Sequence, residues 1–225
     1  MNQVASLQCA ASSEELEKLP ENLANQVPPS VFSAQAAASL RLRSRVHDLR
    51  RVLQEPSLLL EALNAQVRMR RIPNLPVSTR LIGRARICGG RRIRIGERVL
   101  ILGGTVPVEI AALGSGRIEI GDGTSVNYGT SIASYDLVQI GCMCRIGQYV
   151  IINDNDFHDI EDKGALPPSK PVVLEDGVWL GARVIVQKGV RIGHDAVVGA
   201  GSIVTRDIPP RCVAAGMPAR VVRWF

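Results

Sequence analysis

Residues 174–209 read LEDGVWLGARVIVQKGVRIGHDAVVGAGSIVTRDIP, and this stretch decides the fold. Every sixth residue is aliphatic, which gives a column of Leu174, Leu180, Val186, Ile192, Val198 and Val204. Four places after each lies a second column of Val178, Val184, Val190, Ala196, Ser202 and Ile208. A helix repeats its apolar face every three to four residues and a flat strand every two, so a period of six requires short strands separated by regular corners. The stretch therefore predicts a coiled β-solenoid with both columns pointing inward.

The same period can be followed upstream as far as Leu81, so we expect one mainly β domain over residues 73–225. Two breaks interrupt it. Residues 103–117 contain Pro107 and several glycines, and we expect an outward loop there. The longer break, 153–171, has no repeat and carries the acidic residues Asp154, Asp156, Asp159, Glu161 and Asp162. Long irregular loops on rigid frames often carry function, so 153–171 is the predicted active-site loop.

Residues 1–72 form a separate flexible or helical segment by the same reasoning. Residues 1–29 mix Ser, Glu, Asn and Pro with few large apolar residues, and we expect them to be loosely packed. Ser33 is a candidate cap for a helix with Leu42, Val46, Leu49 and Leu53 on one face. A second helix is expected from Pro56, with Leu60, Leu63 and Val67 on one face. This helical appendage would cap the open end of the coil or contact a partner.

Composition limits the function classes. No run approaches the roughly 18 apolar residues of a membrane span, and the first residues do not form a secretion signal, so we expect a cytoplasmic protein. The cysteines number five and are scattered, which argues against a disulfide framework. Cys142 and Cys144 lack a second Cys or His pair, so no metal site is predicted. Cys144 falls in the inward small-residue position.

The net charge of +6 is concentrated upstream, with 15 arginines and four acidic residues between Arg41 and Arg98. Such a cluster could attract an anionic partner through its long-range field. Arg92 and Arg94 alternate with Ile93 and Ile95, however, as on the solvated face of a strand. No aromatic residues interleave with these arginines to stack on bases, so nucleic-acid binding is not expected.

Several motifs in the second half of the chain carry a family resemblance. They are Val126-Asn127-Tyr128-Gly129, Asn155-Asp156-Phe157-His158, Val178-Trp179-Leu180-Gly181, the run from Gly199 to Pro210, and Ala215-Gly216-Met217-Pro218-Ala219-Arg220. From Ile118 onward the chain resembles the hexapeptide-repeat acyltransferases, in particular the branch of galactoside, maltose and xenobiotic O-acetyltransferases. The resemblance implies a left-handed parallel β-helix. It also implies acetyl-CoA as co-substrate, transfer of an acetyl group to a hydroxyl of a sugar or related small acceptor, and a homotrimer with its sites between subunits.

His158 is the predicted catalytic residue. Attack on a thioester requires a base that takes the proton of the acceptor, and imidazole has an ordinary pKa near 6.5. Of the three histidines, His47 falls on a predicted helix and His194 on an outward corner, so only His158 lies in the loop. The family counterpart of His158 is the base, which supports the same choice. Either Asp154 or Asp156 would orient the ring or stabilise the imidazolium.

The resemblance also implies the binding residues. For the acceptor these are Asn127, Asp156 and Trp179. For coenzyme A they are Ala182, Ala200, Thr205, Arg206, Arg220 and Arg223, with the Ala200 backbone N–H on the pantetheine amide and the cations on the phosphates. This chain departs from the sugar acetyltransferases at Ser134-Tyr135, where they have an acidic acceptor-binding residue, and in its N-terminal region. The acceptor therefore stays open.

The sequence leaves two alternative functions open and argues against two others. N-acylation of an amine is an alternative to O-acylation, and a non-catalytic scaffold is another, because hexapeptide coils also serve in assembly. A γ-type carbonic anhydrase needs three zinc-binding histidines, and this coil has two. A sugar nucleotidyltransferase needs a large nucleotide domain before the coil, and the N-terminal third is too short and too helical for one.

Overall fold

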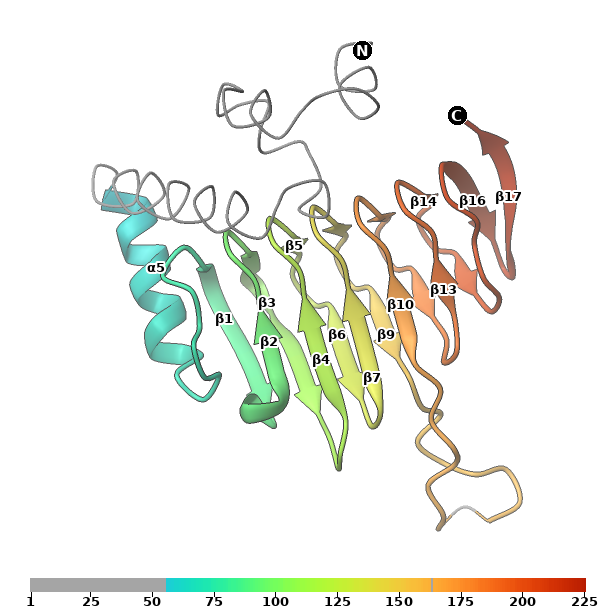
Figure 1. Ribbon diagram of the computed structural model, residues 1–225, viewed down its shortest axis with the longest axis horizontal. Coiled ribbons are helices and arrows are strands. Elements are labelled where there is room, and N and C mark those ends of the chain that lie inside the picture. The colour runs from blue at the N-terminus through green and yellow to red at the C-terminus, as the bar shows by residue number, and fades with distance from the viewer. Residues whose placement is uncertain (1–55, 163) are drawn as a thin grey trace, which may run out of the picture. The chain divides into compact units, whose positions relative to one another are not determined.

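The computed structural model describes residues 56–162 and 164–225 (Figure 1). The expectations for residues 1–29 and for a helix after Ser33 lie outside this part of the chain. The described part begins with the helix α5 (Pro56–Arg68) and continues as strands. These are β1 (Arg80–Cys88), β2 (Ile93–Ile95), β3 (Leu100–Ala112), β4 (Arg117–Ile120), β5 (Ser125–Val126), β6 (Ser131–Ser134), β7 (Leu137–Ile140), β8 (Arg145–Ile146), β9 (Ile151–Asn153), β10 (Val172–Leu174), β11 (Trp179–Leu180), β12 (Ile185–Val186), β13 (Arg191–Ile192), β14 (Val197–Val198), β15 (Ile203–Val204), β16 (Cys212–Gly216) and β17 (Ala219–Trp224). A 3-10 turn, η2 (Gly90–Arg92), precedes β2.

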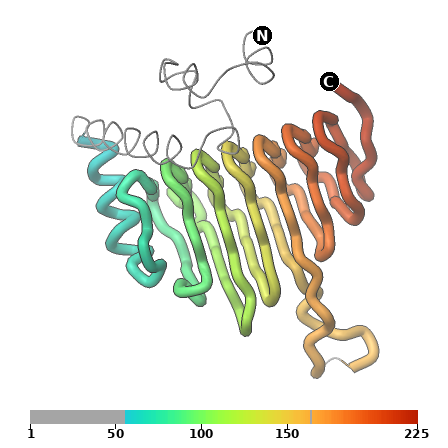
Figure 2. Tube along the Cα trace, in the orientation of Figure 1, coloured from blue at the N-terminus to red at the C-terminus, as the bar shows by residue number. Residues whose placement is uncertain are grey.

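The strands stack as a solenoid whose coils have three faces (Figures 1 and 2). The first face is a sheet of β2, β4, β7, β10 and β13. The second face contains β5, β8, β11 and β14, and the third contains β6, β9, β12 and β15. All neighbours on these faces pair in parallel, and the long strand β3 pairs with both β5 and β6. The predicted parallel β-solenoid is confirmed.

The core is the inside of this coil, and it is filled by the two predicted columns. Every member of the columns from Leu174 to Ile208 is buried, including Leu180 and Ile192 at 0% exposure. The largest fully buried side chains among the described residues are those of Met, Leu and Ile, with no aromatic ring. A narrow core of this kind excludes rings, which agrees with the low aromatic content of the sequence.

The expected outward loop at 103–117 is wrong, because β3 occupies most of it. The pairing of β3 with β1 shifts register between Gly83↔Gly103 and Ala85↔Val108, so the irregularity is a bulge rather than a loop. Pro107 lies within the bulge, where its missing N–H interrupts no ladder hydrogen bond.

The predicted second helix is confirmed as α5, but the face expected to pack is exposed. Leu60, Leu63 and Val67 are 67%, 51% and 66% exposed. The buried side consists instead of Ala62 and Ala65, followed by Met69 and Ile72 beyond the helix. The small side chains of Ala62 and Ala65 allow the helix axis to approach the coil closely.

α5 covers the open end of the coil. β1 is an edge strand, and the side-chain amide of Asn64 donates to its carbonyl oxygens at Leu81 and Gly83, at 2.8 and 2.9 Å. These bonds satisfy edge groups that would otherwise pair with another chain. The predicted capping role is thus confirmed for α5.

Candidate active site

The loop 153–171 leaves the coil after β9 without disturbing it. β9 pairs with β6 and β12, and β10, which follows the loop, pairs with β7 and β13 in the expected register. We call this position the loop corner, defined by residues 135–136, 153–171, 187–190 and 205–207, which connect the third face to the first. The predicted active-site loop is therefore an insertion at one corner of an intact coil.

A buried carboxylate anchors the outgoing limb of the loop. Asp154 is 0% exposed and accepts three hydrogen bonds, from Ser134 Oγ at 2.7 Å and from the backbone N–H groups of Tyr135 and Asp136 at 2.8 Å each. A buried carboxylate is stable only when donors of this kind replace water. Asp154 thus joins the loop to the preceding corner.

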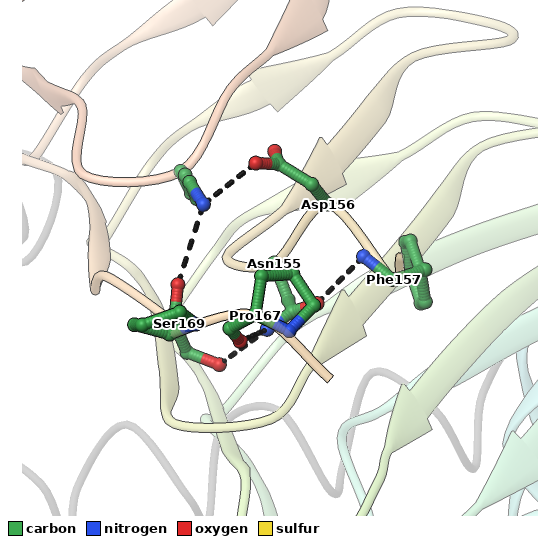
Figure 3. Close-up of polar contacts among 7 residues, drawn as sticks. Asn155, Asp156, Phe157, Pro167 and Ser169 are labelled. Atoms are coloured by element: carbon green, nitrogen blue, oxygen red, sulfur yellow. Dashed lines mark hydrogen bonds and ion pairs between the residues drawn. The ribbon is translucent and has the colours of Figure 1, made fainter. Parts of the chain in front are cut away.

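Asn155 joins the two limbs of the loop to each other (Figure 3). Its Nδ2 donates to Pro167 O at 2.7 Å and to Ser169 Oγ at 2.8 Å, while its Oδ1 accepts the N–H of Phe157 at 2.6 Å. The Phe157 ring meets Tyr135 edge to face, with ring centroids 5.9 Å apart. Both N–H donors and the oxygen of one buried amide therefore connect the two limbs where the loop leaves and rejoins the coil.

His158 is the residue directly after Phe157, at the end of this anchored segment. Its backbone N–H donates to Asp156 O at 2.9 Å, and the residue is exposed. The carboxylate of Asp156 pairs with Lys188 Nζ at 2.6 Å, a residue of the next coil at the same corner (Figure 3). The imidazole is thus carried at an exposed point beside an anchored segment.

The tip of the loop is held by turns. Asp159 Oδ1 accepts the N–H groups of Glu161 and Asp162, and Asp162 Oδ1 accepts that of Gly164. These backbone hydrogen bonds lower the pKa of Asp159 below its ordinary value, because they stabilise the carboxylate. The acidic residues of the tip therefore have a local structural use.

The second group of predicted residues lies at a different corner. We call it the Asn127 corner, defined by residues 127–130, 147–150, 181–184 and 199–202, which connect the second face to the third. Asn127, Ala182 and Ala200 lie in three of its coils. The Oδ1 of Asn127 accepts the N–H of Tyr128 at 2.9 Å. Its Nδ2 donates to no other described residue and remains available to a ligand.

The backbone of the Asn127 corner presents unused donors. Within residues 56–162 and 164–225, the N–H groups of Gln148, Ala182 and Ala200 have no acceptor. A glycine stands just before each of the three. A side chain on two of these glycines would crowd the backbone of the next coil, since a Cβ on Gly147 would lie 2.8 Å from Ala182 N and one on Gly181 would lie 2.6 Å from Ala200 N.

The corner between the first and second faces differs. There the equivalent N–H groups of Glu97, Cys142 and His194 donate to the side chains of Asp122, Asp176 and Glu175. A row of open donors on close-packed backbone is suited to a ligand that brings carbonyl or other oxygen acceptors.

Aromatic and cationic side chains extend the Asn127 corner. Tyr128 and Tyr149 meet edge to face with centroids 5.5 Å apart, and the guanidinium of Arg183 lies 5.8 Å from the Tyr149 ring centroid. Trp179 is on the second face beside Arg145 and Val197 and is 49% exposed.

The predicted coenzyme-binding cations are also on the surface. Thr205 and Arg206 are exposed at the loop corner, and Arg220 and Arg223 are exposed on β17. The structure therefore brings Asp156 and His158 together at the loop corner, and Asn127, Ala182 and Ala200 together at the Asn127 corner. It does not bring the two groups together within one chain.

Sequence reasoning missed Lys188, Tyr149 and Arg183. Counting in sixes puts Tyr149 and Arg183 at equivalent corner positions, so their stacking could have been found. The six-residue count gives Lys188 only an outward corner position, because its contact with Asp156 depends on the path of the loop.

No metal centre emerges from the described residues, which contain no group of three or more His, Cys, Asp or Glu side chains arranged to hold an ion. The Cys144 thiol is buried and donates to Glu175 O at 3.2 Å. Burial raises its pKa to about 12.

No helix of residues 56–162 and 164–225 is long and apolar enough to cross a membrane.

Comparison with known proteins supports the resemblance that the motifs indicate. Residues 171–206 match the family model described as the hexapeptide repeat of succinyl-transferase. The chain is 38% identical over 110 residues to the galactoside O-acetyltransferase of Escherichia coli, an alignment that covers 48% of this chain and 54% of that one. It is 47% identical over 57 residues to a 2,3,4,5-tetrahydropyridine-2,6-dicarboxylate N-acetyltransferase of Staphylococcus aureus, over 25% and 24% of the two chains. The chain thus spans only about half the length of its galactoside O-acetyltransferase relative.

A solved structure covers more of the chain. The hexapeptide-repeat acetyltransferase of Vibrio cholerae, crystallised with acetyl coenzyme A, aligns over 86% of this chain and 92% of its own, with 26% identity and a TM-score of 0.50. The similarity to hexapeptide-repeat acyltransferases is therefore confirmed. The relatives include both O- and N-acetyltransferases.

Proposed function

We propose that the protein is an acetyl-CoA-dependent O-acetyltransferase that acts on a hydroxyl of a sugar or related small acceptor. The observation that carries this proposal is the single histidine on the loop inserted into an otherwise regular coil. His158 is exposed and follows a segment that the buried amide of Asn155 anchors. The identity with galactoside O-acetyltransferase favours a hydroxyl over an amine as the acceptor group.

His158 is the general base in this proposal. Its imidazole takes the proton from the acceptor hydroxyl as the oxygen attacks the thioester carbonyl carbon. The C–S bond then breaks, the acetyl group stays on the acceptor oxygen, and the imidazolium returns the proton to the departing sulfur. Positioned acid–base catalysis of this kind contributes roughly 10² to 10⁴ in rate.

Coenzyme A fits the Asn127 corner. Its pantetheine arm carries amide carbonyls, and the unused N–H groups of Ala182 and Ala200 are donors for them. Asn127 and Trp179 are proposed to contact the acceptor. The cations Arg206, Arg220 and Arg223, with the hydroxyl of Thr205, are proposed to meet the phosphates. Asp156 remains a proposed part of the acceptor side, although its carboxylate already pairs with Lys188.

A complete site requires two copies of the chain, because the base and the proposed coenzyme donors lie at different corners of one coil. We propose a homotrimer in which the loop of one copy reaches the Asn127 corner of the next. Ile151, Ile185 and Ile203 pair in register and point outward as an aliphatic column on the third face, next to the Asn127 corner. This column is the proposed contact.

The decisive test is His158→Ala. We expect acetyl transfer from acetyl-CoA to fall by at least about 100-fold, while thermal stabilisation by coenzyme A is retained. A panel of sugars, aminosugars and amino acids identifies the acceptor and separates O- from N-acylation. Turnover near that of the unmodified protein would exclude His158 as base. An absence of any stabilisation by coenzyme A would favour the scaffold alternative.

A further inference from the structure

We infer that Lys188 is a positioning residue. It holds the two limbs of the loop where they leave and rejoin the coil, a region that we call the loop base, and thereby keeps His158 in place for catalysis. This inference rests on the proposed function for its catalytic consequence only. The structural part of the inference, which we call the clamp, is that Lys188 holds Asp156 and the two limbs of the loop together.

Lys188 contacts both limbs at once. Its Nζ lies 2.6 Å from Asp156 Oδ2 in the outgoing limb and donates to Pro168 O in the returning limb at 3.3 Å. Only Phe157 separates Asp156 from His158, and the His158 N–H donates to Asp156 O. A displacement of Asp156 therefore moves the histidine.

The lysine end of this ion pair is held better than in an ordinary surface pair. Exposed pairs contribute little because water competes and long side chains lose freedom. The Asp156 side chain is 57% exposed, but that of Lys188 is only 23% exposed and projects from a corner of the rigid coil between β12 and β13. Its backbone neighbour Gly189 donates to Lys170 O at 3.0 Å, which fixes the returning limb on the same corner. The ammonium thus comes from a preorganised position.

The remaining contacts of the loop base do not duplicate this one. Asp154 ties the outgoing limb to the coil below, and Asn155 ties the two limbs to each other. Lys188 adds a side-chain contact from the coil above, next to the backbone hydrogen bond from Gly189 to Lys170 O. Without it, the segment from Asp156 to Pro168 loses its ion pair with that coil, and closing a freed loop costs entropy.

The reacting groups must be placed to within about an ångström, and a misplacement of that size can cost about 100-fold in rate. We therefore expect Lys188→Met, which keeps the aliphatic stem, to lower kcat at least about tenfold. The KM for acetyl-CoA should change less than about threefold, since Lys188 is not part of the Asn127 corner and its side chain contacts the loop rather than Thr205 or Arg206. Lys188→Arg restores the charge and should recover most of kcat. The double variant with Asp156→Asn should be no slower than the slower single variant.

A measurement without catalysis tests the clamp directly. In hydrogen exchange, the amides of 155–169 should exchange faster in Lys188→Met than in the unmodified protein, while those of β12 and β13 stay protected. Arg86→Met is the matched control, because it breaks a 2.8 Å ion pair with Glu109 far from the loop and should change neither exchange nor kcat.

The outcomes separate the two proposals. Unchanged loop exchange in Lys188→Met, or a kcat unaffected by it, would overturn the positioning role. Faster loop exchange combined with full activity of His158→Ala would keep the clamp and reject the proposed base instead.

Discussion

Ser134 Oγ donates to Asp154 Oδ2 at 2.7 Å, deep beneath the inserted loop. The same carboxylate accepts two backbone N–H groups, so Asp154→Ala leaves three donors without a partner. Hydrogen bonds to a charged group contribute about 1.5 to 3 kcal/mol, and we expect Asp154→Ala to lower the free energy of unfolding by roughly that amount or somewhat more.

Ser134→Ala is the graded control for this prediction, since it removes one donor and leaves the backbone pair intact. Its cost should be about 1 kcal/mol, measured with the same urea titration. Equal stability of Asp154→Ala and the unmodified protein would mean that the loop is not anchored at this point.

Mixed oligomers test the sharing of a site between copies. His158→Ala lacks the base, and Ala200→Trp fills the exposed Asn127 corner; each alone should be inactive. In a cyclic trimer assembled from equal amounts of both variants, roughly a quarter of the sites combine a loop that has His158 with an Asn127 corner that has Ala200. Activity should therefore reappear after co-refolding or co-expression. If no activity returns although mass measurements detect mixed trimers, both half-sites would have to come from one copy.

Gly181→Ala should disturb the Asn127 corner, because the added Cβ would lie 2.6 Å from the backbone nitrogen of Ala200. Overpacking of this kind costs about 1 to 3 kcal/mol, and we also expect weaker binding of coenzyme A in a thermal shift titration. Gly104→Ala provides the comparison, since a Cβ there meets nothing within 4 Å. It should change stability by less than about 0.5 kcal/mol. Identical behaviour of the two variants would contradict the close packing of the corner.

The cysteines should differ sharply in alkylation. Cys88 is exposed, whereas Cys144 and Cys212 are buried. Burial raises the pKa of both buried thiols, and at a pKa of about 12 only about one molecule in ten thousand carries the Cys144 thiolate at pH 8. Of the cysteines that the structure describes, Cys88 should be the first that iodoacetamide modifies, as detected by peptide mass spectrometry. Cys144 and Cys212 should react only after unfolding in guanidinium, and early labelling of Cys144 in the folded protein would show that the coil opens locally.

The regular parts of this molecule could be predicted from the sequence because each position of the six-residue repeat requires the same kind of side chain in every coil. Leu174 and Ile192 occupy equivalent places in successive coils, so a simple count gives their burial. The same count predicts the loop, because the six-residue pattern is missing there. The α5 helix was predicted from Pro56, but its buried side was not, since Leu60 and Ala62 both satisfy a helical period and only the space against the coil decides between them.

The contacts of the loop could not be predicted in the same way. The acidic residues of 153–171 look alike in the sequence, yet Asp154 is buried, Asp156 pairs with Lys188, and Asp159 closes a turn. Each use depends on the path of the chain between β9 and β10. The division of the candidate site between two corners, in contrast, follows from the repeat, because Asn127 comes after a strand of the second face and His158 after one of the third.

The strands on either side of the loop keep their pairing register, and this bears on how the acceptor of such a protein can change. After the residues inserted between β9 and β10, β10 resumes its pairing with β7 in register. The scaffold therefore places no condition on the length or composition of the loop tip beyond its two fixed ends. New acceptors could be accommodated by replacing that one segment, while the wall of stacked coils, and whatever binds along it, stays the same.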